Sequence, residues 1–163
     1  MNNNKINKIN KLCGVLMTKV IFIDIDGILN SASGVEPFAS DMEVKKLNFL
    51  HELIKETGSL GVVITSDRRC SKIDIKNKID ALQTYGINVL GCIRFPNDDD
   101  NDNRGQQIVD YLSCTDFKIE RILILDDNDD GISNIFEDEY ILVDNTYGLD
   151  EKVYLKALDI LNK

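Results

Sequence analysis

Residues 20–30 read VIFIDIDGILN, and this stretch decides the fold class. Four apolar, largely β-branched residues lead into Asp24, and Asp26 follows two positions later with Gly27 behind it. A continuous apolar run that ends at a turn signal predicts a strand buried on both faces, as in the centre of a parallel sheet. Side chains two apart on an extended segment point to the same side, so Asp24 and Asp26 can address one ligand.

Apolar runs and helical patterns alternate along the rest of the chain. Four more strands are expected at Leu60–Ile64, Ile87–Ile93, Ile122–Leu125 and Tyr140–Val143. Helices are expected from a Ser40/Glu43 capping box to Gly58, from Ser71 to Tyr85, from Arg104 after Asn103, and from Asp150 to Leu161. This alternation predicts an α/β fold, a Rossmann-like three-layer sandwich with a mainly parallel five-stranded sheet.

Length and composition favour one domain. The 163 residues suffice for a single core, which we place at residues 19–163, behind a polar extension at residues 1–18 that we expect to be disordered. No insertion between the expected elements is long enough for a separate cap domain.

The charge, the cysteines and the absence of a long apolar run bear on the compartment in which the protein is expected. The net charge is −9, but eight acids lie in two runs without lysine or arginine, at residues 98–102 and 126–130, so the remainder is close to neutral. The four cysteines are far apart, which is typical of thiols in a reducing cytoplasm. No apolar run reaches membrane-spanning length, so we expect a cytoplasmic protein with no membrane partner.

Polar clusters follow three of the expected strands. They are Asp24 with Asp26, Thr65 with Ser66, and Asp126 with Asp127. Ligands of open α/β sheets bind outside the carboxyl ends of the strands, so these clusters are expected to meet. Converging carboxylates cannot all stay ionised at neutral pH without a cation, and an all-oxygen set that also receives a phosphate suits Mg²⁺.

The order of these clusters resembles the haloacid dehalogenase-like (HAD) phosphohydrolases across Lys19–Leu161. The segments RGQQI (104–108), ILILDD (122–127) and YGL (147–149) are similar, more narrowly, to the small HAD domains of Swiss Army Knife RNA repair proteins. The resemblance implies a HAD-like fold and a Mg²⁺-dependent phosphatase that works through an aspartyl-phosphate. It also implies a phosphorylated substrate, which we expect to be a nucleotide or the end phosphate of a short nucleic acid.

The resemblance also assigns the site residues. Asp24 is similar to the family's nucleophile, and Asp26 to its general acid. Thr65 is similar to the phosphate-binding hydroxyl, with Ser66 as its substitute, and Arg104 stands where the family usually has a lysine that neutralises phosphate. The implied magnesium ligands are Asp24, Asp26, Asp126 and Asp127, with Asp130 as the alternative to Asp127.

Other interpretations of these residues remain open. A catalytically silent HAD-like binding module or a phosphatase of small phosphorylated metabolites would share the same motifs. The spacing from Asp126 to Glu137 matches an EF-hand calcium loop, although an EF-hand needs a helix where Ile122–Leu125 predicts a strand. A receiver domain also uses strand-end acids, but it lacks the pattern at Asp24–Gly27. Each aspartate taken alone is most simply a solvated turn residue.

Overall fold

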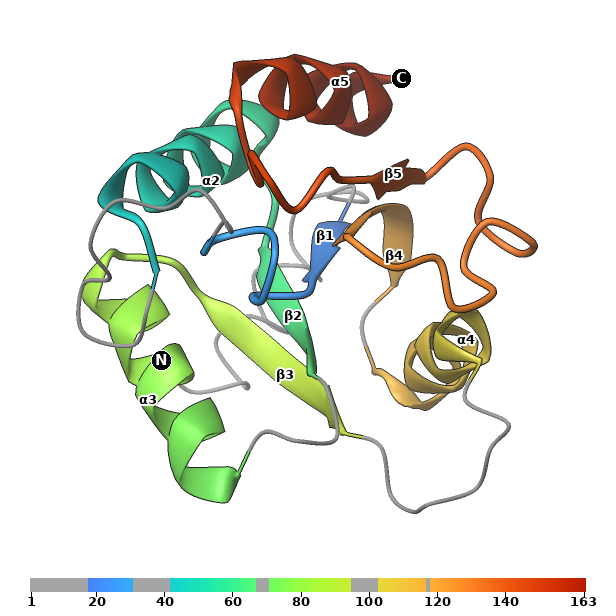
Figure 1. Cartoon of the computed structure of the whole chain (residues 1–163). Helices are drawn as coiled ribbons and strands as arrows, with labels where there is room; N and C mark the ends of the chain where they lie inside the picture. The colour runs from blue at the N-terminus through green and yellow to red at the C-terminus, as the bar shows by residue number, and fades with distance from the viewer. Residues whose placement is uncertain (1–17, 31–41, 67–70, 95–102, 117) are drawn as a thin grey trace, which may run out of the picture.

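The computed structural model describes residues 18–30, 42–66, 71–94, 103–116 and 118–163 (Figure 1). The strands are β1 (Thr18–Ile23), β2 (Gly61–Ser66), β3 (Val89–Arg94), β4 (Ile119–Asp126) and β5 (Tyr140–Leu142). The helices of the described residues are α2 (Val44–Thr57), α3 (Lys72–Thr84), α4 (Arg104–Cys114) and α5 (Glu151–Asn162). The predicted α/β class is confirmed.

All five strands are parallel and lie in the order β3-β2-β1-β4-β5. The central strand β1 therefore has β2 on one side and β4 on the other. Ile23 pairs with Ile64 of β2 and with Leu125 of β4. This register places the residues that follow, Asp24, Thr65 and Asp126, at one level of the carboxyl edge, as the sequence predicts for ligand binding.

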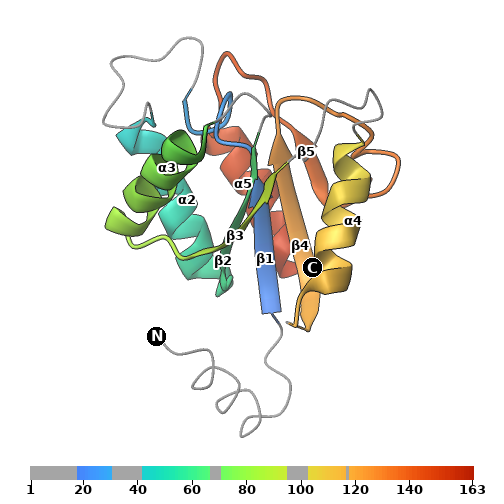
Figure 2. The same cartoon turned by 90° about the horizontal axis from the view of Figure 1, so that it is seen from below.

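The sheet separates two apolar layers, and alternate residues of β1 enter each of them. Ile21 and Ile23 join the layer formed with α2, α3 and α5, whereas Val20 and Phe22 join the layer formed with α4. Figures 1 and 2 show α2 and α5 on one face of the sheet and α4 on the other. A strand buried on both faces needs apolar residues at every position, and this requirement explains the unbroken run in VIFI.

Most helix ends fall where the sequence predicts them. Gly58 ends α2 in a left-handed conformation (φ 67°), Ser71 forms a capping box with Asp74 at the start of α3, and Asn103 and Asp150 cap α4 and α5. The start of α2 differs from the prediction, because its N-cap is Glu43, which makes no side-chain cap bond. The Glu43 carboxylate lies 2.8 Å from Lys46 Nζ instead, and Ser40 lies outside the described residues.

Several strands begin at other residues than the sequence predicts, among them β2, which starts at Gly61 and not at Leu60. The strand β4 starts at Ile119, three residues before the predicted Ile122, because the charged Glu120 and Arg121 interrupt the apolar run on which the prediction rests. The strand β3 starts at Val89, since the Ile87 N–H donates to Leu82 O and closes the end of α3.

The predicted domain boundary lies close to the first strand. Strand β1 begins at Thr18, while residues 1–17 of the predicted extension and the acidic run at 98–102 lie outside the described residues. None of the helices in the described part of the chain is both long and apolar enough to cross a membrane.

Candidate active site at the carboxyl edge of the sheet

Three carboxylates meet where β1 and β4 end side by side. The Asp24 N–H donates to Leu125 O at 3.0 Å, which ties the end of β1 to β4. One carboxylate oxygen each of Asp24, Asp126 and Asp127 lies within 4.8 Å of the others. Asp24 and Asp126 are buried and Asp127 is half-buried. Asp24 of the first predicted cluster therefore lies beside Asp126 and Asp127, as the sequence predicts.

The turn after β1 leaves space for Asp127. Gly27 adopts φ 83°, and a Cβ at this position would collide with the Asp127 carboxylate. The loop after β5 closes this side, because the Leu149 N–H donates to Ile28 O at 2.8 Å and Asn145 Nδ2 donates to Asp127 Oδ2 at 3.3 Å. Glycine is needed here both for its backbone conformation and for its lack of a side chain.

Arg104 is the first residue of α4, and its side chain extends into the group of carboxylates. Its Nη1 donates to Asp24 Oδ2 at 3.0 Å and also to Asp126 Oδ2, and the arginine is itself buried. The backbone holds it there, since the Arg104 N–H donates to Asp130 O at 2.9 Å. The arginine that the sequence predicts as a phosphate ligand therefore forms a buried ion pair with two predicted metal ligands.

Charge in this group is only partly balanced. Burial and the nearby Asp126 raise the pKa of Asp24 to about 7, although Arg104 opposes the shift. Burial also raises the pKa of Asp126 against the effect of Arg104. Burial lowers the pKa of Arg104, but the charges of Asp126 and Asp24 outweigh it and raise the pKa. Because the carboxyl groups still hold protons more tightly than usual, the site fits a further cation.

The donor set suits a hard divalent ion. The three grouped residues offer only carboxylate oxygens, which Mg²⁺ prefers. Asp26, the expected fourth ligand, is not a member of this group. Asp130, the alternative to Asp127, lies on the arginine side, with its Oδ2 4.0 Å from Arg104 Nη2.

Thr65 brings a buried hydroxyl to the same edge. It is the fifth residue of β2, almost fully buried, and its Oγ1 has no hydrogen-bond partner in the described part of the chain. A buried hydroxyl without a partner is unfavourable, so this position suits a bound ligand that supplies an acceptor or donor. Ser66, its predicted substitute, is the last residue of β2.

Asp26 is held by a residue that the sequence did not single out. Lys78 Nζ from α3 lies 3.0 Å from Asp26 Oδ1 and 2.9 Å from Oδ2. Asn30 Nδ2 donates to Oδ1 at 3.0 Å, and Asn30 Oδ1 accepts the Gly27 N–H at 2.8 Å. The Asp26 side chain is about half exposed, which puts it at the mouth of the site.

The calcium-loop interpretation does not fit this geometry. The segment before Asp126 is the strand β4, where an EF-hand requires a helix. Asp130 Oδ1 accepts from Asn128 Nδ2 at 2.9 Å, and Asp129 is bonded to Ser133. These side chains serve the turn itself.

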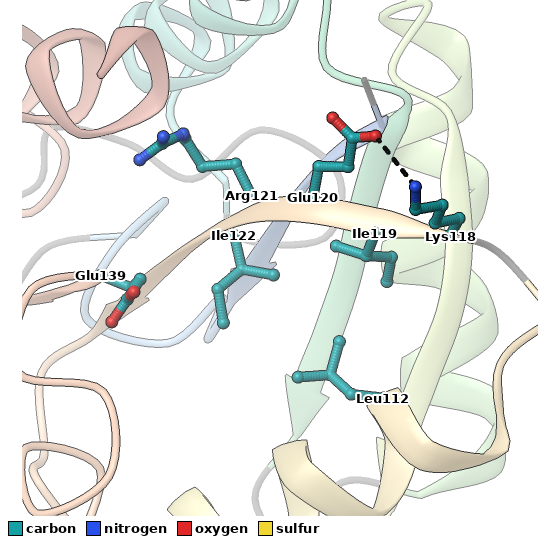
Figure 3. Close-up of a pocket in the computed structure, with 7 residues that line it drawn as sticks. All are labelled: Leu112, Lys118, Ile119, Glu120, Arg121, Ile122 and Glu139. Carbon is teal, nitrogen blue, oxygen red and sulfur yellow. Dashed lines mark ion pairs between the residues drawn. The ribbon is translucent and has the colours of Figure 1, made fainter. Parts of the chain in front are cut away.

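A cavity of roughly 590 Å³ lies at the opposite end of β4 (Figure 3). Figure 3 shows Leu112, Ile119 and Ile122 on one side of the β4 ribbon and Glu120 and Arg121 on the other. Ile119 precedes Asp126 by seven residues, which is about 23 Å of extended strand. This cavity is therefore remote from the carboxylate group.

Comparison with protein families identifies a match over most of the chain. The family described as "HAD domain in Swiss Army Knife RNA repair proteins" matches residues 20–153. No curated protein and no solved structure matches the chain. The matched range contains all the residues of the candidate site described above.

Proposed function

The chain belongs to the family of HAD domains in Swiss Army Knife RNA repair proteins, and from this membership and the site geometry we propose that it is a Mg²⁺-dependent phosphatase. One observation carries the proposal. Asp24, Asp126 and Asp127 converge within 4.8 Å at the carboxyl edge of the sheet, where Thr65 adds a buried hydroxyl that has no hydrogen-bond partner among the described residues. A phosphoryl group that binds here meets a nucleophile, a hydrogen-bonding group and a cation site together.

The residues of this chain would divide the chemistry in two steps. A carboxylate oxygen of Asp24 bonds to phosphorus as the bond to the leaving oxygen breaks, and Asp26 gives its proton to that oxygen. Asp26 then takes a proton from a water molecule whose oxygen displaces Asp24 from phosphorus. Phosphate and free Asp24 result, and Asp26 again carries its proton.

The remaining residues would bind and neutralise the phosphoryl group. Thr65 Oγ1 hydrogen-bonds a phosphoryl oxygen, with Ser66 next to it in sequence, and Arg104 offsets negative charge beside Asp24. Asp24, Asp126 and Asp127 would hold Mg²⁺. When bound, this ion supplies positive charge to the phosphoryl oxygens.

We propose a nucleotide or the end phosphate of a short nucleic acid as the substrate. The family description names RNA repair proteins, and Asp26 is about half exposed at the mouth of the site, so a large leaving group can extend into solvent. The two acidic runs, at residues 98–102 and 126–130, disfavour a long nucleic-acid track. A small phosphorylated metabolite is the competing substrate class.

A catalytically silent binding module is the second candidate. The observation that favours it is the position of Arg104, whose Nη1 donates to the nucleophile Asp24 and also to Asp126. An arginine that stays between these carboxylates would occupy the place of the cation. The two candidates differ in whether the protein turns over a phosphate.

A phosphatase panel separates these possibilities. Wild-type protein and Asp24→Asn are assayed on 5′- and 3′-phosphorylated oligonucleotides, nucleotides and sugar phosphates, with Mg²⁺ and with EDTA. We expect Mg²⁺-dependent phosphate release by the wild type, fastest on the nucleotide substrates, and none by Asp24→Asn. Faster turnover of sugar phosphates would show that the substrate is a small metabolite. No turnover of any substrate would favour the binding module.

A further inference from the structure

Lys78 occupies an unusual position for a lysine. The buried residues of α3 are Ile75 and Leu82, and Lys78 lies three residues after the first and four before the second. This spacing puts it on the stripe of the helix that faces the protein. Its side chain is only 14% exposed, whereas Lys76, two residues earlier, is 73% exposed.

The ammonium group of Lys78 contacts the Asp26 carboxylate across 52 residues of sequence. Its distances of 3.0 Å and 2.9 Å to the two carboxylate oxygens show that it spans both of them. The ion pair formed by Lys76 with Asp80 is an ordinary i,i+4 pair on the helix surface. Burying a lysine and fixing its long side chain is unfavourable, so the contact with Asp26 has to compensate for it.

The Asp26 carboxylate is thus fixed from two directions. Asn30, itself bonded to the Gly27 N–H, donates to Oδ1 from the turn after β1, and Lys78 approaches from α3. Without these contacts, a half-exposed aspartate would be free to change rotamer. The second step of the proposed reaction needs a carboxylate oxygen of Asp26 within hydrogen-bond reach of the attacking water, so a carboxylate fixed beside an ammonium group favours this proton transfer.

We propose that Lys78 is a positioning residue that holds the Asp26 carboxylate at the mouth of the site. This inference rests on the proposed function, in which Asp26 transfers the proton. Lys78 acts through Asp26, so the helix α3 contributes a residue that positions a catalytic group. The contact also explains why a lysine stands on the buried stripe of α3.

Steady-state kinetics of three variants test this role. Lys78→Met removes the charge, Lys78→Arg keeps it, and Lys76→Met is the matched control on the same helix. We expect Lys78→Met to lower kcat about tenfold or more, with KM within about twofold, because proton transfer is impaired while phosphate binding is not. Lys78→Arg restores part of kcat, and Lys76→Met leaves both constants unchanged.

Chemical denaturation without substrate tests the contact itself. The free energy of unfolding is measured for Lys78→Met, Asp26→Asn and the double variant, and non-additive effects are expected because the two side chains touch. Additive effects would overturn the contact. A rise in KM with kcat unchanged would show that Lys78 binds substrate, and an equal loss of kcat in Lys76→Met would show a general helix effect; either result overturns the positioning role. A wild type without any phosphatase activity would refute the proposed function instead, whereas additivity refutes the contact in an active or inactive protein.

Discussion

Three ionisable groups lie buried together where β1 and β4 end, those of Asp24, Asp126 and Arg104. One arginine cannot balance two buried carboxylates and the nearby Asp127. The pKa of Asp24 is therefore raised to about 7 by burial and by Asp126, in spite of the arginine. At the residue scale, the site is short of positive charge, and two predictions depend on this shortage.

The first prediction concerns pH in metal-free protein. Between about pH 4 and pH 7 the folded state keeps a proton on Asp24 that the unfolded state has lost, so the stability of the wild type falls as pH rises through this window. The asparagine side chain of Asp24→Asn does not titrate, so this variant lacks the effect. The difference in unfolding free energy between the two proteins should therefore change by about 4 kcal/mol between about pH 4 and pH 7.

Urea denaturation in EDTA at several pH values measures this difference. The groups whose pKa is lowered, among them Asp74, Asp129 and Asp144, are present in both proteins, so their effect on stability cancels in the difference. Parallel pH profiles for wild type and Asp24→Asn would contradict the raised pKa.

The second prediction concerns Arg104. Replacing it with methionine leaves Asp24 and Asp126 without their cation, and the loss of one partner from a buried ion pair destabilises a protein by about 3 kcal/mol or more. Mg²⁺ should restore part of this loss, so the rise in Tm on adding Mg²⁺ should be larger for Arg104→Met than for the wild type. Thermal denaturation with EDTA and with Mg²⁺ checks both effects.

Arg121→Met is the control for this comparison, because Arg121 contacts Ile160 O at the far end of β4. It should leave the response to Mg²⁺ unchanged. An Arg104→Met protein as stable as the wild type in EDTA would show that the ion pair contributes nothing.

The elements of the fold act mainly by bringing short segments to one edge. The turn after β1 approaches Asp127 closely, because a Cβ at Gly27 would collide with the Asp127 carboxylate. Gly58 offers a matched comparison, since it also has a positive φ, at the end of α2, but a Cβ there would meet nothing within 4 Å.

Alanine at the two glycines should therefore have different effects. Both substitutions place an L-residue in the left-handed region, which costs about 1–2 kcal/mol of stability. Only Gly27→Ala should also displace Asp127 and weaken Mg²⁺ binding, which isothermal titration calorimetry measures. Equal Mg²⁺ affinity in the two variants would contradict the close approach at Gly27.

Much of this arrangement follows from local sequence patterns. An apolar run buried on both faces predicts β1, and parallel strands place Asp24, Thr65 and Asp126 at the same edge. The sequence does not predict two of the contacts, because each depends on the direction in which a side chain points from one helix toward the end of β1. Periodicity places Arg104 at the start of a helix and Lys78 within one, but it does not show that they reach Asp24 and Asp26.

The molecule as a whole is acidic, with a net charge of −9, and it gathers several carboxylates at one edge. A divalent cation that binds only the folded state stabilises that state by mass action. Thermal denaturation should therefore show a Tm that rises with Mg²⁺ concentration, and Asp126→Ala should weaken the rise. A stronger response to Ca²⁺ than to Mg²⁺, with turnover in Ca²⁺, would revive the calcium-loop interpretation.

The proposed substrate class gives a prediction for the whole molecule under changing salt. In the proposed function Arg104 offsets the charge of the phosphoryl group, so a short oligonucleotide should be held near its end phosphate by few charges. We expect kcat/KM for a terminal oligonucleotide phosphate to exceed that for sugar phosphates and to fall modestly as salt rises. Preference for sugar phosphates, with no effect of salt on the oligonucleotide, would exclude this substrate class.

The most direct test of the account is to look for the covalent intermediate. Wild-type protein is mixed with a phosphomonoester and Mg²⁺, quenched in acid during turnover, digested, and analysed by mass spectrometry. We predict a phosphoryl group on Asp24, absent in Asp24→Asn and in EDTA. Turnover without a phosphorylated residue, or with the phosphoryl group on another aspartate, would contradict it.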